Sequence, residues 1–166
     1  MADTSSFDIT STIDFQEVDN ALNQARKEVG QRYDFKGAVA DIDLKPADKT
    51  LTLTTSDEMK MQALWEILQT RLVRRGVAVK NFKVGDSAPA AGGTVRRIIT
   101  IQSGIPIEAA KDIVKFLKEK KLKKVQATIQ ADQVRVTSPS KDELQEAMKA
   151  LRDHDFGVAL QFGNRR

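Results

Sequence analysis

The sequence predicts an α+β protein made of two tandem ferredoxin-like (βαββαβ) domains, each a four-stranded antiparallel sheet with two helices on one face. Strand-like and helix-like segments of the 166-residue chain follow the order βαββαβ once, and the same order then recurs. Residues with capping-box spacing stand at the same relative place in both copies, as Thr55 with Glu58 and as Ser140 with Glu143. These repeats indicate duplication of one α+β unit.

In the first copy, alternating apolar residues predict strands, and apolar residues three or four apart predict helices. Phe7 and Ile9 alternate with polar residues in the first strand, and Asp14 precedes the first helix with Glu17 in capping-box position. A turn at 46–48 joins the two middle strands. The six predicted elements occupy residues 6–13, 14–31, 38–45, 50–55, 55–76 and 77–84.

In the second copy, Pro106 has the first position of a helix, where its missing N–H is tolerated. The hairpin that follows alternates strictly between apolar and polar residues on both sides of its Ala131–Asp132 turn. The predicted elements are a strand at 95–102, a helix from 106 to the lysines that begin at 118, the hairpin at 125–137, a helix from 140 and a strand near 158–162.

The stretch from Lys118 to Thr137 is the best candidate for a binding surface. Its helix ends in a block of lysines, and the polar side of the hairpin presents amide, hydroxyl, lysine and arginine groups together. Cations bind phosphate and amides can read base edges, so this side suits a nucleotide better than an apolar ligand. A solvated sheet face without a ligand would show the same pattern, and this alternative stays open. The polar side consists of Lys124, Gln126, Thr128, Gln130, Gln133, Arg135 and Thr137.

Charge is divided unevenly between the two halves. Residues 1–93 carry 12 Lys and Arg against 14 Asp and Glu, whereas residues 94–166 carry 15 against 9. The basic second half favours a polyanionic partner. Helices cover only one side of each sheet, so the acidic open face of the first half is expected to lie against the basic face of the second or to flank an interdomain cleft. The acidic face consists of Asp41, Asp43, Thr50, Thr52 and Thr54.

The motif RYDFKG, which begins at Arg32, follows neither the helical nor the strand period. One interpretation is structural: Gly37 ends the helix, and Tyr33 and Phe35 fold back over the edge of the core. The other is a ligand-binding loop, in which Arg32 and Lys36 bind phosphate and a ring stacks on a base. Both interpretations stay open.

The segment 85–94, GDSAPAAGGT, is rich in glycine and small residues, which indicates a linker or the tip of a long hairpin. As a linker it gives a first domain at 1–87, a linker at 88–94 and a second domain at 95–166. The pattern does not decide whether the first strands of the two copies stay in their own domains or are exchanged. No GxxxxGK[ST] or GxGxxG motif is present, so these glycines are not a phosphate-binding loop.

The composition provides little for catalysis or metal binding. The chain has no cysteine, and its only histidine, His154, lies between two acids in an expected surface turn. A Ser-His-Asp triad would need this histidine, and no GxSxG motif accompanies it. We therefore expect no enzyme activity, metal or cofactor. The aromatic motif of RNA-recognition sheets is also missing, so a nucleic acid would be bound through its phosphates.

A cytoplasmic protein without a membrane partner is expected. The N-terminal residues lack the basic start and apolar core of a signal peptide, and no apolar run approaches the roughly 18 residues that cross a bilayer. The absence of cysteine is compatible with a reducing compartment.

Eight motifs in consistent order resemble the YajQ family of bacterial proteins along essentially the whole chain. The motifs SFDITSTID, RYDFKG, RGV, GGTVRR, GI, VQATIQADQVRVTS, KDELQ and DFGVALQF begin at Ser6, Arg32, Arg75, Gly92, Gly104, Val125, Lys141 and Asp155. The resemblance implies two ferredoxin-like domains and a nucleotide-binding protein, with cyclic di-GMP, GTP and tRNA among the ligands proposed for the family. It also implies a ligand-binding effector and not a catalyst.

The chain departs from the family pattern at three places. The family tends to have glycine at the position of Ala131 and a Gly-Lys-like pair at Ser138–Pro139. It also tends to end in Asn-Phe/Tyr-Arg, where this chain ends with Gly163–Arg166. If the family's ligand contacts the hairpin turn or the final ring, this chain is expected to bind it differently.

These observations predict a nucleotide-binding effector that holds cyclic di-GMP or a GTP-like ligand on a basic surface or in an interdomain cleft. Guanidinium groups are suited to phosphate and to the O6/N7 edge of guanine. Two alternatives stay open: a sequence-tolerant RNA or DNA (tRNA) binding protein, and a protein–protein adaptor, for instance for a transcription-related protein, with incidental nucleotide binding. The candidate binding residues are Arg32, Tyr33, Phe35, Lys36, Arg96, Arg97, Lys123, Lys124, Gln126, Gln130 and Arg135.

Overall fold

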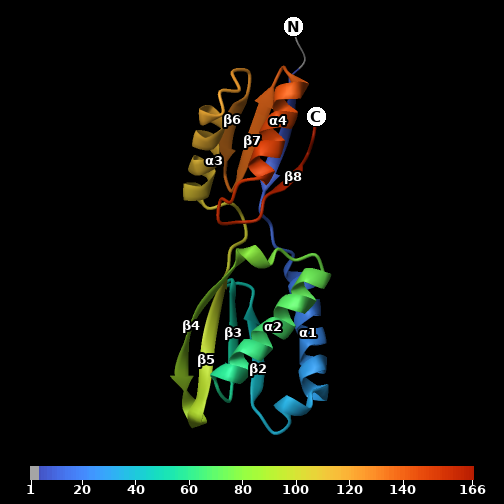
Figure 1. Ribbon diagram of the computed structural model, residues 1–166, viewed down its shortest axis with the longest axis vertical. Coiled ribbons are helices and arrows are strands. Elements are labelled where there is room, and N and C mark those ends of the chain that lie inside the picture. Colours follow the sequence, from blue (N-terminus) through green and yellow to red (C-terminus); the bar gives the residue numbers. More distant parts are fainter. Residues whose placement is uncertain (1–3) are drawn as a thin grey trace. The chain divides into compact units, whose positions relative to one another are not determined.

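The computed structural model describes residues 4–166 and divides them into two compact units. Unit 1 contains the described residues up to Thr12 together with Ser103–Arg166, and unit 2 contains Ile13–Gln102. Each unit has one four-stranded antiparallel sheet and two α-helices (Figure 1). The predicted α+β class with two ferredoxin-like units is therefore confirmed.

Unit 2 consists of α1 (Phe15–Gln31), β2 (Ala40–Lys45), β3 (Thr50–Thr55), α2 (Glu58–Arg74), β4 (Phe82–Ala90) and β5 (Thr94–Ile101), with 3₁₀ turns at Tyr33–Phe35, Val79–Asn81 and Ala91–Gly93. Its strands have the order β2-β3-β5-β4, and α1 and α2 cover one side of the sheet (Figure 1). The fully buried strand residues Leu51, Leu53 and Ile99 pack against the apolar stripes of both helices.

Unit 1 consists of β1 (Ser5–Thr10), α3 (Ile107–Glu119), β6 (Gln126–Gln130), β7 (Gln133–Ser138), α4 (Lys141–Arg152) and β8 (Gln161–Gly163). Its strands have the order β6-β7-β1-β8, so β1 lies in the interior of the sheet (Figure 1). Phe7 is paired opposite Val136 of β7, and Ile9 opposite Phe162 of β8. Phe7 and Ile9 are fully buried and form the centre of the unit 1 core.

The first strands of the two copies are exchanged between the sheets. β1 pairs with β7 and β8 of the second copy, whereas β5 pairs with β3 and β4 of the first. The chain consequently passes between the units twice, once after Thr12 and once after Gln102.

The predicted linker at 88–94 does not separate the units. Ala90 is paired with Thr94 at the end of the β4–β5 hairpin, so this segment is the hairpin tip that the sequence left as an alternative. The long antiparallel register keeps β5 beside β4, and the structural units therefore differ from the predicted domains at 1–87 and 95–166.

Helix starts agree with two of the three predicted caps. The side chains of Asp14 and Ser140 accept backbone N–H bonds at the starts of α1 and α4. At α2 the prediction of Thr55 is wrong, because Asp57 is the cap. Thr55 ends β3, and its hydroxyl donates to the carbonyl of Val39 instead.

Two predicted strands begin at least three residues later than expected. The strand expected at 77–84 begins only at Phe82, after a 3₁₀ turn in which the buried Asn81 amide donates to the Gln102 carbonyl at 2.9 Å. The strand expected near 158–162 begins at Gln161, and Val158 packs in the core from the preceding loop. None of the helices within residues 4–166 has the length and apolar character needed to cross a lipid bilayer.

Candidate functional site

The motif that begins at Arg32 forms the turn between α1 and β2. Phe35 is only 4% exposed and packs in the core of unit 2, whereas Tyr33 is 88% exposed. Gly37 ends the turn with a φ of 76°, a conformation that favours glycine. Each interpretation of the motif therefore applies to one ring: Phe35 closes the core, and the ring of Tyr33 is open to solvent.

A pocket of about 620 Å³ lies beside this turn. Its lining comes from the last turns of α1, from the motif and from the first residue of β2, and it includes three cations, Arg26, Arg32 and Lys36. The guanidinium of Arg26 donates to the carbonyl of Ile42 at 2.6 Å, which fixes its position at the pocket. We call this site the Arg32 pocket.

The charges of the Arg32 pocket are partly compensated. Arg32 donates two hydrogen bonds to the carboxylate of Asp34, at 2.9 and 2.7 Å, and its guanidinium lies 5.7 Å from the centre of the Phe35 ring. These hydrogen bonds lower the pKa of Asp34 and raise that of Arg32. Lys36 is exposed, and no carboxylate among residues 4–166 forms an ion pair with it. Lys36 is therefore the cation most available to an anionic ligand.

Arg96 and Arg97 lie on opposite faces of the unit 2 sheet, because adjacent strand residues alternate. Arg96 is paired opposite Thr54 on the open face. Arg97 lies on the helix side, where it donates to Glu58 at 3.2 Å, and its side chain is only 14% exposed. Its Nε is buried without a hydrogen-bond partner. The two arginines, both predicted to bind the ligand, therefore do not share a face of the sheet.

The open face of the unit 1 sheet is polar, as the hairpin alternation predicted. Gln126, Gln130 and Arg135 lie on this side, away from the helices. The exchanged strand β1 adds Ser6, Asp8 and Thr10 to this face, although these residues belong to the first half of the sequence. The backbone of Arg166 also pairs with that of Ser6, through N–H···O bonds of 3.1 and 2.9 Å.

Asp8 neutralises the strongest candidate cation of this face. It lies opposite Arg135 in the β1–β7 register and accepts hydrogen bonds from Arg135 Nε at 2.9 Å and from the Asn164 amide at 2.7 Å. The hydrogen bonds from Arg135 and Asn164 hold the pKa of Asp8 below its ordinary value of 3.8, and the bond to Asp8 raises the pKa of Arg135. Arg135 is therefore already paired with Asp8 within the sheet, which the prediction that it binds phosphate did not include.

The eleven predicted binding residues fall in two separate units. Lys123, Lys124, Gln126, Gln130 and Arg135 belong to unit 1, and the other six belong to unit 2. Lys123 and Lys124 are exposed in the turn that leads into β6. The structure therefore offers two candidate surfaces, the Arg32 pocket in unit 2 and the open sheet face with its lysine block in unit 1.

Strand exchange also removes the charge difference between the halves. Unit 1 contains 13 Lys and Arg against 11 Asp and Glu, and unit 2 contains 14 against 12, so each carries a formal net charge of +2. β5 and β4 add Arg96 and Lys83 to the open face of unit 2, which is therefore mixed in charge and not acidic. The charge difference that favoured an interdomain cleft in the sequence therefore does not hold between the two structural units.

The only histidine belongs to an aromatic cluster on unit 1. The ring centre of His154 lies 4.7 Å from that of Phe116 and 4.6 Å from that of Phe156. Within residues 4–166, no three or more His, Asp or Glu side chains gather in a geometry that could hold a metal ion.

A family profile described as "Nucleotide-binding protein YajQ-like" matches residues 5–166. The chain belongs to the YajQ-like family. Among its relatives, a "Nucleotide-binding protein" of Solibacter usitatus is 50% identical over 161 residues, which cover 97% of this chain and 96% of the relative. Proteins of the same name from Acidithiobacillus ferrooxidans and Carboxydothermus hydrogenoformans are 47% and 45% identical, with 97% and 100% of this chain covered and 98% and 100% of the relatives.

The backbone conformation of the hairpin turn in this YajQ-like chain explains why glycine would be favoured at the position of Ala131. Ala131 adopts a φ of 54°, in the left-handed region where glycine is favoured. Gly104 packs against the same turn with a φ of 92°, and a Cβ atom there would lie 2.6 Å from the Asp132 carboxylate. Ala131 is therefore accommodated in a strained turn, whereas a larger residue at Gly104 would collide with the Asp132 side chain.

The other two departures of this YajQ-like chain are also structural. The Ser138 hydroxyl accepts the N–H of Ser140 at 3.0 Å, just before α4. At the end of the chain, Asn164 binds Asp8 and Arg166 extends the sheet along Ser6. Asn164 and Arg166 gave no periodic signal in the sequence, because their roles depend on contacts with β1.

Proposed function

We propose that this chain binds a guanine nucleotide, cyclic di-GMP or a GTP-like ligand, in the Arg32 pocket. The observation that carries the proposal is the combination of one almost fully exposed ring, Tyr33, with three cations around one pocket. The names of its relatives, nucleotide-binding proteins, support this ligand class.

The pocket provides the two contacts that a nucleotide needs. Lys36 and Arg26 offer donors for phosphate, and the ring of Tyr33 offers a face on which a base can stack. Arg32 keeps three of its five N–H donors beyond the two bonded to Asp34 and suits a phosphate or the O6/N7 edge of guanine. A volume of about 620 Å³ lies within the usual range for small-molecule sites. Phe35, in the core, supports the turn and does not contact the ligand.

Replacing Tyr33 by alanine is expected to weaken nucleotide binding by about tenfold or more, since stacking of one base contributes about 1–3 kcal/mol. Lys36→Gln is expected to weaken binding through the phosphate. Isothermal calorimetry with cyclic di-GMP and with GTP measures both effects. Lys27→Gln, an exposed lysine of α1 outside the pocket, is the matched control and should bind like wild type. Absence of heat with both nucleotides, or unchanged binding by Tyr33→Ala, would refute the proposal.

A second candidate function is sequence-tolerant binding of RNA on unit 1. The specific observation is the exposed lysine block next to a sheet face that is polar and carries no aromatic ring. Such a surface would contact phosphates, and each contact would release counterions. The role proposed for the chain is binding in either case, without catalysis.

Salt dependence distinguishes the two functions. For single-stranded RNA on unit 1, a log–log plot of affinity against salt is expected to have a slope of about −0.7 for each phosphate contacted. The double change Lys123→Gln and Lys124→Gln should reduce the magnitude of this slope by about 1.4, whereas the same change at Lys27 and Lys45 of unit 2 should leave it unchanged. Fluorescence anisotropy measures the slope, and a slope equal in all three proteins would contradict RNA binding by the lysine block.

A further inference from the structure

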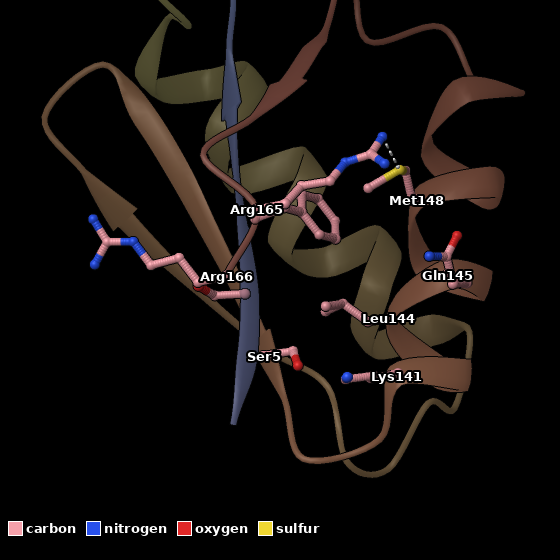
Figure 2. A pocket seen from close by; sticks show the side chains of 9 residues that line it. Ser5, Lys141, Leu144, Gln145, Met148, Arg165 and Arg166 are labelled. Atoms are coloured by element: carbon pink, nitrogen blue, oxygen red, sulfur yellow. Dashed lines mark hydrogen bonds between the residues drawn. The ribbon is translucent and has the colours of Figure 1, made fainter. Parts of the chain in front are cut away.

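A small cavity lies on the helix side of unit 1, between β1, α4 and the last two residues of the chain (Figure 2). Its volume is about 140 Å³. Phe7, Leu144 and Met148, all buried residues of the unit 1 core, provide its apolar wall. This volume is too small for a nucleotide, since sites for drug-sized ligands measure roughly 300–1,000 Å³. It is close to the roughly 150 Å³ of an apolar cavity that holds benzene.

Three cations line the same cavity, Lys141, Arg165 and Arg166, and the side chains of the first two lie on the α4 side of β1 (Figure 2). The guanidinium of Arg165 contacts the Met148 sulfur at 3.3 Å, and a thioether is only a weak hydrogen-bond acceptor (Figure 2). Lys141, in the first turn of α4, also lines the cavity. No carboxylate among residues 4–166 forms an ion pair with either side chain. The donors of Arg165 are therefore available to an anion that enters the cavity.

The backbone determines which of the two terminal arginines has its side chain on the α4 side of β1. Arg166 pairs with Ser6 through both of its backbone groups, so the end of the chain continues beside β1 after the short strand β8. Side chains of neighbouring strand residues point to opposite faces. Arg165 accordingly lies over Met148 of α4, whereas the side chain of Arg166 points away from α4, on the other side of β1 (Figure 2).

We propose that this cavity binds a small organic carboxylate with a compact aromatic or branched apolar body. The apolar body fits against Phe7, Leu144 and Met148. The carboxylate accepts hydrogen bonds from Arg165 and is attracted by the positive charge of Lys141. The planar fork of a guanidinium matches a carboxylate in two parallel hydrogen bonds. Inorganic phosphate could use the cations but would leave the apolar wall uncovered. The site is separate from the Arg32 pocket, which belongs to unit 2.

The test uses benzoate as the probe and the methyl signals of isotope-labelled methionines as the readout in NMR. Benzoate is expected to shift the Met148 signal in a saturable way, because the ring would contact this side chain. Met59 and Met61, both in unit 2, are internal references and should not move. Benzamide, which has the same shape without the charge, should bind about tenfold more weakly, and phosphate should not shift Met148.

Matched variants separate the site from a general charge effect. Arg165→Gln should weaken benzoate about tenfold and leave benzamide unchanged, whereas Arg166→Gln removes the same charge from the other side of β1 and should change benzoate binding by less than about twofold. An unmoved Met148 signal would overturn the proposal. So would equal affinities for benzoate and benzamide, a phosphate-induced shift like that of benzoate, or equal effects of the two variants. None of these results bears on nucleotide binding in unit 2.

Discussion

Replacing Phe7 by alanine is expected to destabilise unit 1 by about 3–5 kcal/mol and to leave unit 2 nearly unchanged. Phe7 is fully buried in the strand at the start of the chain, and its ring packs edge-on against Phe162 at 5.7 Å. It lies opposite Val136 in the interior of the unit 1 sheet. Loss of the ring would leave a cavity between the strand and both helices of that unit.

The reciprocal change is Ile99→Ala. Ile99 belongs to the first strand of the second copy, yet it is fully buried in unit 2 and lies opposite Leu51. This change is expected to destabilise unit 2 by about 2–5 kcal/mol. Each variant is therefore expected to destabilise the unit that contains most of the other copy of the sequence.

Each unit has its own reporter. Trp65 is the only tryptophan, is 6% exposed and belongs to the unit 2 core, so its fluorescence reports on unit 2. The methyl signal of Met148 reports on unit 1. In urea, Phe7→Ala should lower the midpoint of the Met148 transition, and Ile99→Ala that of the Trp65 transition. The opposite assignment, with Phe7→Ala lowering only the Trp65 midpoint, would contradict strand exchange.

Local pattern was sufficient to predict the elements, but it could not predict which sheet receives each first strand. The alternation of Phe7 and Ile9 with polar residues says which side of the strand is buried. It contains no information about the partner strand, since both sheets offer an apolar side of the same kind. In β5 the pattern is also broken, because Arg97 lies on the helix side at a position opposite Leu53.

The candidate site was predictable where it depends on residues close in the sequence. The motif at Arg32 lacks any period, and it forms a turn with one buried and one exposed ring. The partner of Arg135 could not be predicted in the same way, because Asp8 is 127 residues away and was assigned to the other half. The net charges of the two halves did not predict those of the two units for the same reason. The charged residues of β1 belong to unit 1 and those of β5 to unit 2.

Protonation or removal of the Asp8 carboxylate is expected to destabilise unit 1. Asp8 is 6% exposed, and its oxygens accept hydrogen bonds from Arg135 and Asn164. Hydrogen bonds to charged groups contribute about 1.5–3 kcal/mol, so Asp8→Ala should lower the free energy of unfolding of unit 1 by about that amount. Asp41→Ala, an exposed acid on the open face of unit 2, is the matched control and should have little effect.

The pH dependence of this effect has a defined sign. Arg135 and Asn164 hold the folded-state pKa of Asp8 below its ordinary value of 3.8, so the folded state binds this proton less readily than the unfolded chain. The stabilisation is therefore fully present above the ordinary pKa and is lost as the pH falls through the lower, folded value. The difference in stability between wild type and Asp8→Ala should be constant near neutral pH and shrink only in the acid range.

Arg135→Met separates the ion pair from the other roles of Asp8. If the carboxylate acts mainly through Arg135, the double variant Asp8→Ala, Arg135→Met should be more stable than the sum of the two single changes predicts, because each single change leaves the other partner unpaired. Urea unfolding of unit 1 at neutral pH measures this coupling. Additive effects would mean that Asn164, which joins β1 to the end of the chain, is the partner that matters.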